Sequence, residues 1–197
     1  MKLIQAIESL TRWAGWVGAI LIFPLVGALV VEVFSRYVIG RPTLWAFEIS
    51  YMVMGAMFML GMANALRIGH HVSVDLVSMQ LNDKTNALLR MIGYVLFLPI
   101  LAWLVWELFH YALQAFNSNE RSGRSAWNPI VWPILTVWFI GFTLLALQVI
   151  AELLKAVAIL RGQPLPEEPA LMSSYLSLLM FPVLMLFIFP VFRSPFR

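Results

Sequence analysis

Long apolar runs separated by short polar stretches dominate the 197-residue chain. A helix needs about 20 mostly apolar residues to cross a bilayer. Five runs approach or exceed that length, at residues 13–35, 44–66, 91–115, 130–154 and 171–192. The first four predict membrane-spanning helices. The fifth, interrupted by Pro182 and Pro190, predicts an apolar helix that either spans, lies in the interface or docks on another protein.

The pattern therefore predicts an all-α integral membrane protein with three parts. Residues 1–160 form a four-helix transmembrane bundle, residues 161–170 form a Pro-rich linker, and residues 171–197 form a C-terminal apolar helix and tail. The charged start "MKLIQAIESLTRW" resembles that of a signal peptide, but the apolar run after it is too long and has no small-residue cleavage site. We expect it to stay attached as a signal anchor.

Composition agrees with this class and excludes several kinds of site. The chain is 61% hydrophobic and 12% charged, against about 45–50% and 25% in soluble domains. No block is left for an aqueous catalytic domain, so we expect no enzyme activity. The absence of cysteine excludes disulfides, thiolate metal sites and cysteine nucleophiles. Because the basic residues are scattered near helix ends, anionic lipid head groups are a better expected partner than nucleic acid.

The distribution of Lys and Arg between loops predicts a cytoplasmic N-terminus. Seven basic residues fall on the N-terminal side of the membrane and four on the other, or six if the fifth run also crosses. The first set is Lys2, Arg12, Arg67, Lys84, Arg90, Lys155 and Arg161, and the second is Arg36, Arg41, Arg121 and Arg124, joined by Arg193 and Arg197 after a fifth crossing.

The polar stretch "RIGHHVSVDL", residues 67–76, raises the question of a metal site, a haem site, a proton relay or a surface turn. A haem held by two histidines needs both at a similar depth. His110 lies about 30 Å along its helix from Arg90, so it is near the opposite membrane surface from His70 and His71. The geometry excludes such a haem, and we expect no metal and no cofactor. A turn capped by Gly69 is the simpler interpretation.

Three acids are expected near the outer membrane surface, together with nearby basic side chains. Glu32 and Arg36 can pair along one helix face, as can Glu107 and His110. One hypothesis is a site for a coupling ion or proton. The other, favoured because these positions lie near helix ends, is a structural network tying three helices together. The full predicted set is Glu32, Arg36, Arg41, Trp45, Glu48, Glu107 and His110.

Small residues in the second apolar run predict a surface that another helix can approach closely, either inside the chain or from a partner subunit. These are Gly55, Ala56, Gly61 and Ala63, with Ala65. No internal repeat is evident, so the inverted repeats of many self-sufficient transporters give no support here. No phosphate loop or nucleophile elbow is present.

Two stretches, "SRYVIGRPTLWAFEIS" and "MLGMANALRIGHHVSVDLV", resemble the small membrane subunit of tripartite ATP-independent periplasmic (TRAP) transporters. One departure is Phe47, where the family usually has the first acid of a pair, which leaves Glu48 alone. Another is the fifth apolar run, since the small subunit usually has four helices. The matching positions are Arg36, Tyr37, Val38, Pro42, Trp45, Glu48, Ala65, Arg67, Gly69, His71, Val74 and Asp75.

The resemblance implies a sodium-driven importer of organic acids in a bacterial inner membrane. In that family a periplasmic substrate-binding protein delivers the solute to a two-subunit complex, whose large transmembrane permease subunit moves as an elevator while the small subunit braces it. In this setting Arg67, Gly69, His71 and Asp75 shape a cytoplasmic turn, across which Arg67 and Asp75 can pair. Two alternatives remain: a self-contained oligomeric ion or metabolite carrier, and a membrane anchor subunit of a redox complex.

Overall fold

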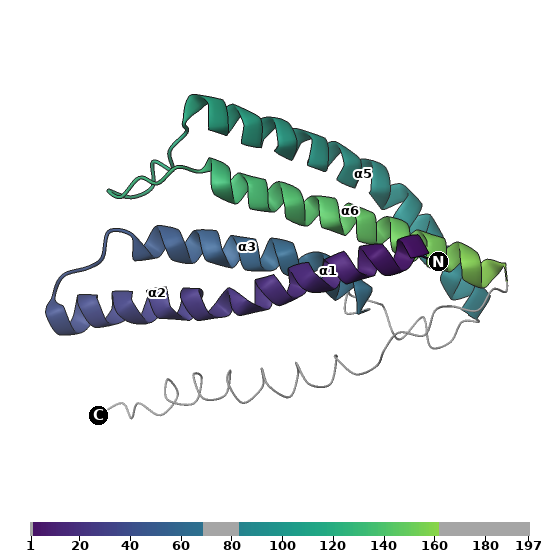
Figure 1. Cartoon of the computed structure of the whole chain (residues 1–197), viewed down its shortest axis with the longest axis horizontal. Coiled ribbons are helices and arrows are strands. Elements are labelled where there is room, and N and C mark those ends of the chain that lie inside the picture. The colour runs from purple at the N-terminus through teal and green to yellow at the C-terminus, as the bar shows by residue number, and fades with distance from the viewer. Residues whose placement is uncertain (1, 69–82, 162–197) are drawn as a thin grey trace, which may run out of the picture. The chain divides into compact units, whose positions relative to one another are not determined.

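The computed structural model describes residues 2–68 and 83–161, and all of its regular elements in these ranges are helical (Figure 1). They are α1 (Lys2–Ile20), α2 (Ile22–Phe34), the π-helical turn η1 (Ser35–Ile39), α3 (Ala46–Arg67), α5 (Asp83–Ser118) and α6 (Trp132–Leu160). Within the described ranges the nearest approach to β-structure is a single antiparallel bridge between Arg121 and Ile130. The all-α prediction is therefore confirmed for this part of the chain.

Four helical stretches of the described residues are long and apolar enough to cross a membrane, as the sequence predicted. They are Lys2–Ile39, Ala46–Arg67, Leu88–Ser118 and Trp132–Leu160. Of the linker predicted at residues 161–170, only Arg161 is described. The apolar helix predicted at residues 171–192 lies outside the described residues. So do Gly69, His71 and Asp75 of the predicted turn.

The first span begins earlier than its apolar run suggested. Helix α1 starts at Lys2 rather than near residue 13, because Ile4 and Ile7 form an apolar face that is buried against Ala151 of α6. α1 and α2 follow one another closely, with the break at Leu21. Pro24 explains it: its ring meets the carbonyl of Ile20 and it has no N–H to donate there.

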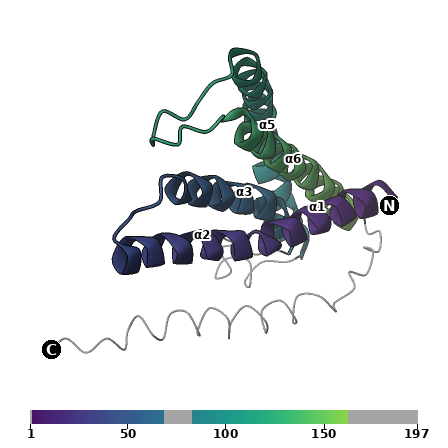
Figure 2. The ribbon, with the colours of Figure 1, turned by 60° about the vertical axis from the view of Figure 1, so that its left-hand side comes forward.

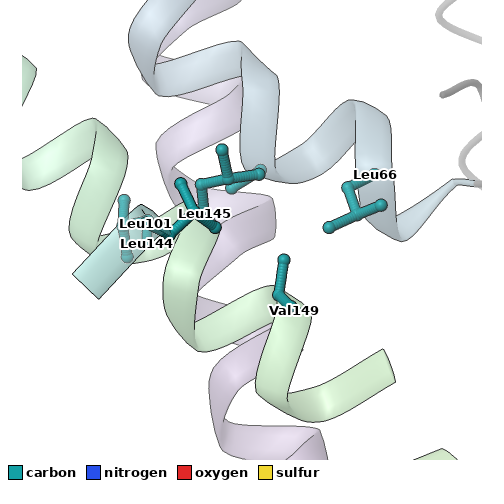
Figure 3. Close-up of a cluster of buried hydrophobic side chains, with 6 residues drawn as sticks. Leu66, Leu101, Leu144, Leu145 and Val149 are labelled. Atoms are coloured by element: carbon teal, nitrogen blue, oxygen red, sulfur yellow. The ribbon is translucent and has the colours of Figure 1, made fainter. Parts of the chain in front are cut away.

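Helix α3 packs against α1 and α2 on one side and against α6 on another, while α5 packs on α6. Figures 1 and 2 show α2 running beside α3, and α5 beside α6. Where three of these helices meet, a cluster of aliphatic side chains is buried (Figure 3). Its members are Ala63 and Leu66 of α3, Leu101 of α5, and Leu144, Leu145 and Val149 of α6.

Glycines of the helices that flank α3 make close contacts with its backbone. A Cβ atom added at Gly141 of α6 would lie 2.7 Å from the carbonyl oxygen of Met59, and one at Gly18 of α1 would lie 3.2 Å from that of Met57. Only a residue without a side chain allows backbones to approach so closely. Gly18 and Gly141 were not among the predicted interface residues, although both lie in apolar runs.

The small residues predicted on α3 divide into two groups. Ala56 and Ala63 are buried within the chain, and a Cβ at Gly55 would lie 3.1 Å from the indole nitrogen of Trp138. These three serve internal packing. Gly61 differs, because an added Cβ would find no atom within 4 Å.

Candidate functional site

Glu32 holds together the turn that connects α2 to α3. One carboxylate oxygen, Oε1, accepts hydrogen bonds from Arg36, including one from Nε at 2.9 Å. The other, Oε2, accepts from the hydroxyl of Thr43 and from its backbone N–H at 2.9 Å. The predicted Glu32–Arg36 pair is confirmed, and both oxygens of this carboxylate are occupied by the chain's own donors.

The chain reverses direction inside this turn because Gly40 adopts a left-handed conformation, with φ of +72°, which glycine adopts without strain. The backbone N–H of Arg41 then donates to the carbonyl of Ser35 at 3.0 Å. The Arg41 side chain is left exposed, and Trp45 is partly buried immediately before α3. Glu32, Ser35, Arg36, Arg41 and Thr43 are called the turn cluster below.

Glu48 is the most deeply buried acid among the described residues, with 1% of its surface exposed. It lies in the first turn of α3, where the helix dipole favours a negative charge. Its carboxylate accepts a hydrogen bond from the hydroxyl of Ser122, which belongs to the loop between α5 and α6. Glu48 therefore turns toward this other loop, and the described ion pairs do not join it to Arg36 or Arg41.

Arg124 of the same loop completes the surroundings of Glu48. Its guanidinium carbon lies 4.7 Å from the centre of the Tyr51 ring, within the range of a cation–π contact. A side-chain hydrogen bond with Tyr51, together with the electrostatic effects of Tyr51 and Glu48, raises the pKa of Arg124. The arginine is thus a permanent cation near the buried carboxylate.

The loop at residues 119–131 has a defined conformation of its own. Asn119, Gly123 and Asn128 have positive φ angles. The Asn128 carbonyl accepts a hydrogen bond from Arg121 Nη1 at 3.0 Å, and its side-chain oxygen accepts one from the Gly123 N–H at 2.8 Å. The Ser122 N–H donates to the Pro129 carbonyl at 3.0 Å. These bonds hold Ser122 where it meets Glu48.

Glu107 and His110 lie apart from the other two acids. Both are exposed on α5, and among the described contacts they form no ion pair with each other. The His110 ring instead packs edge-on against Trp106 and Phe109, with ring centres 4.6 and 5.7 Å apart. In the described part of the chain, the three predicted acids do not form one network: Glu32 and Glu48 each have their own partners, and Glu107 faces outward.

A further set of charges, which the sequence analysis missed, joins α1 to α6. Lys155 Nζ lies 2.5 Å from Glu8 Oε1 and 3.0 Å from Glu152 Oε1, and Gln148 Nε2 donates to Glu152 at 2.9 Å. Glu8 and Gln148 are buried. These four residues are called the ion cluster below. The spacing of Gln148, Glu152 and Lys155 places them on one helix face, and that was the available signal.

Of the predicted turn motif, the described part contains only Arg67, whose Nε donates to Asn64 Oδ1 at 3.1 Å. The pairing of Arg67 with Asp75 stays a prediction. Across residues 2–68 and 83–161, no group of three or more His, Asp or Glu residues is arranged to hold a metal ion.

Comparison with known proteins gives two matches. Residues 25–158 match the family described as tripartite ATP-independent periplasmic transporters, DctQ component. The chain is also 25% identical over 121 residues to the sialic acid TRAP transporter permease protein SiaT of Haemophilus influenzae (strain 86-028NP). That match covers 59% of the chain but only 17% of SiaT, so the chain spans a small part of that relative's length. No solved structure matches the chain.

Proposed function

Since the chain belongs to the family of DctQ components of TRAP transporters, we propose that it is the subunit that braces the large permease subunit of a sodium-coupled, binding-protein-dependent importer. The family is one of transporters rather than enzymes. With four apolar helices long enough to cross a bilayer among its described residues, the chain is a multi-pass inner-membrane protein.

The bracing role is supported by the partners of four acids, of which Glu8 and Glu48 are buried and Glu32 and Glu152 are partly buried. Glu32 binds the turn cluster through both carboxylate oxygens, and Glu48 binds Ser122. Glu8 and Glu152 share Lys155. A coupling-ion site needs carboxylate oxygens that are free to bind and release a cation. These four carboxylates instead hold the chain's own turns and helices, which supports a structural role over ion binding.

The partners follow from the same proposal. A large permease subunit covers part of the helix bundle within the membrane, and a periplasmic substrate-binding protein meets the opposite side from a cytoplasmic N-terminus. The end of the bundle that carries residues 35–45 and 119–131, called the loop end below, exposes Arg41, Arg121 and Arg124. Because the name of SiaT assigns sialic acid to that relative, an organic acid is the class of solute that we propose.

Transport by reconstituted vesicles tests this function. Vesicles that contain the chain, the large permease subunit and the binding protein should take up an organic acid when a sodium gradient is imposed. Vesicles that contain the chain alone should show no uptake. Sodium-dependent uptake by the chain alone would instead support a self-contained carrier, and a haem absorption band in the purified chain would support a redox anchor.

A further inference from the structure

Helix α5 has two stripes of residues that repeat at the spacing of a helix-packing seam, four and three residues alternately. One stripe faces α6: Leu101 and Ala115 are buried, and the positions between them are partly buried. The other stripe is exposed throughout its length. We call it the exposed seam; its members are Leu96, Ile100, Trp103, Glu107, His110 and Gln114.

The polar half of the exposed seam lies at membrane depth. Phe109 packs against Phe139 of α6, with ring centres 5.4 Å apart. Phe139 is seven residues beyond Trp132, the first residue of α6, which is about 10 Å along the helix at 1.5 Å per residue. Glu107 precedes Phe109 by two residues, so it lies about half a helical turn farther from the loop end than Phe109 does. A carboxylate at this depth is inside the hydrocarbon region, where it is costly unless it has a partner.

The exposed surface of helix α2 has a different composition. The large exposed side chains of α2 are all apolar, and they include Phe23, Leu29 and Val33. The acid of α2, Glu32, is turned into the turn cluster. On α5 an acid, an imidazole and an amide instead follow one another along one exposed stripe. Acyl chains offer these groups no hydrogen bonds.

We propose that the exposed seam is where a transmembrane helix of the large permease subunit docks, with a cationic or hydrogen-bond-donating side chain opposite Glu107 and His110. Leu96, Ile100 and Trp103 provide the apolar half of this contact, and the polar half fixes its register. The negative charge of Glu107 selects a partner helix that carries a donor at the same depth. The inference rests on the proposed function, because that function supplies the large subunit.

Cross-linking from single cysteines tests the assignment directly, because the chain has no cysteine of its own. Cysteines replace Ile100, Trp103 or Gln114 in the seam, and Val95 or Leu113 as controls, which are exposed on the same helix but rotated by about 100°. The full chain is labelled with a benzophenone maleimide in membranes that contain its large subunit. We expect adducts with the large subunit from the seam positions and much less from the controls.

Each other outcome overturns the proposal in a distinguishable way. Adducts that form mainly from the control positions, or that join two copies of the chain, show that the seam is not the docking site for the large subunit. The proposed function then survives if the wild-type chain still retains the large subunit on purification. If the wild-type chain never retains a large subunit, the proposed function itself fails.

A charge test sharpens the result. Glu107→Leu should reduce the amount of large subunit retained by about three- to thirtyfold, as expected for loss of a hydrogen bond between membrane helices. Val95→Leu, on the control face, should leave retention unchanged. If Glu107 faces lipid, Glu107→Leu will leave retention unchanged as well, and the proposal is wrong.

Discussion

The two ends of the helix bundle use buried charge differently. At the loop end, Glu32 and Glu48 bind donors that belong to connecting segments: Thr43 in one, Ser122 in the other. At the N-terminal end, the ion cluster joins two helices directly, through Lys155 of α6 and Glu8 of α1. The loop end therefore fixes the conformation of turns, whereas the ion cluster fixes which helices are neighbours. Removing charge at the two ends should have effects of different kind and size.

The largest effect is expected from Lys155→Leu. The substitution leaves Glu8 and Glu152 facing each other without a cation. Breaking a fully buried pair costs about 3–5 kcal/mol, and we expect about 3 kcal/mol because Lys155 keeps some contact with water. Unfolding of the purified chain, followed by tryptophan fluorescence, measures the loss. Lys155→Arg is the control and should retain most of the stability; equal stability of Lys155→Leu and wild type would contradict a stabilising ion cluster.

Between the two ends, Gly141→Ala probes the contact that holds α6 against α3. The new methyl group would lie 2.7 Å from a backbone carbonyl that cannot rotate away, so the helices must separate. We expect a loss of about 2 kcal/mol, typical of overpacking. The matched control is Gly61→Ala, where the methyl group meets no atom within 4 Å. Equal effects of the two substitutions would show that α3 and α6 do not approach as closely as described.

At the loop end, Ser122→Ala should cost about 1.5 kcal/mol, because it removes a hydrogen bond to a buried carboxylate. Unlike Lys155→Leu, it should loosen the 119–131 loop without separating helices. Faster hydrogen exchange in that loop, with exchange in α1 unchanged, would agree with this expectation. Ser118→Ala at the end of α5 is the control, because that hydroxyl donates to the Gln114 carbonyl of its own helix and does not hold the loop. Exchange that rises equally in α1 would mean that the two ends do not act separately.

The smallest effect on global stability is expected from Glu32→Gln, because Arg36 is largely exposed and water can replace it. The consequence should be local, since an amide group cannot accept four hydrogen bonds as the carboxylate does. We expect faster proteolysis within residues 35–45 and an unchanged melting temperature. Thr43→Val, which keeps the charge but removes one donor, should produce a weaker version of the same change. A large fall in melting temperature would place Glu32 among the residues that hold the helices.

Local patterns predicted some of these features and could not predict others. The four spans follow from the length of the apolar runs alone. Glu32 and Arg36 pair because a spacing of four residues places two side chains on the same face of a helix. The partner of Glu48 depends on how the 119–131 loop folds, which positive φ angles at two asparagines help to decide. An apolar run gives the depth of a residue but not the rotation of its helix. For that reason Gly55 and Gly61, both predicted at an interface, face different surroundings.

The ion cluster was missed for a different reason. Residues 2–12 lie before the first apolar run and resemble the charged start of a signal peptide, so the pattern gives no reason to place Glu8 in a helix that packs on others. In the structure α1 extends through these residues, and its apolar face lies against α6. A weakly amphipathic segment next to a strongly apolar one is easily assigned to the membrane surface, because the partner that buries it is far away in the sequence.

The contact between Glu8 and Lys155 also bears on the order in which the protein is assembled. It joins the first to the last of the four spans found among the described residues, and the chain is synthesised from its N-terminus. Glu8 therefore enters the membrane surface well before Lys155 has been made, and its charge is satisfied by water or lipid head groups until α6 has been inserted. Formation of this ion pair is then a late event in biogenesis, and it marks a chain in which the four described spans are all in place.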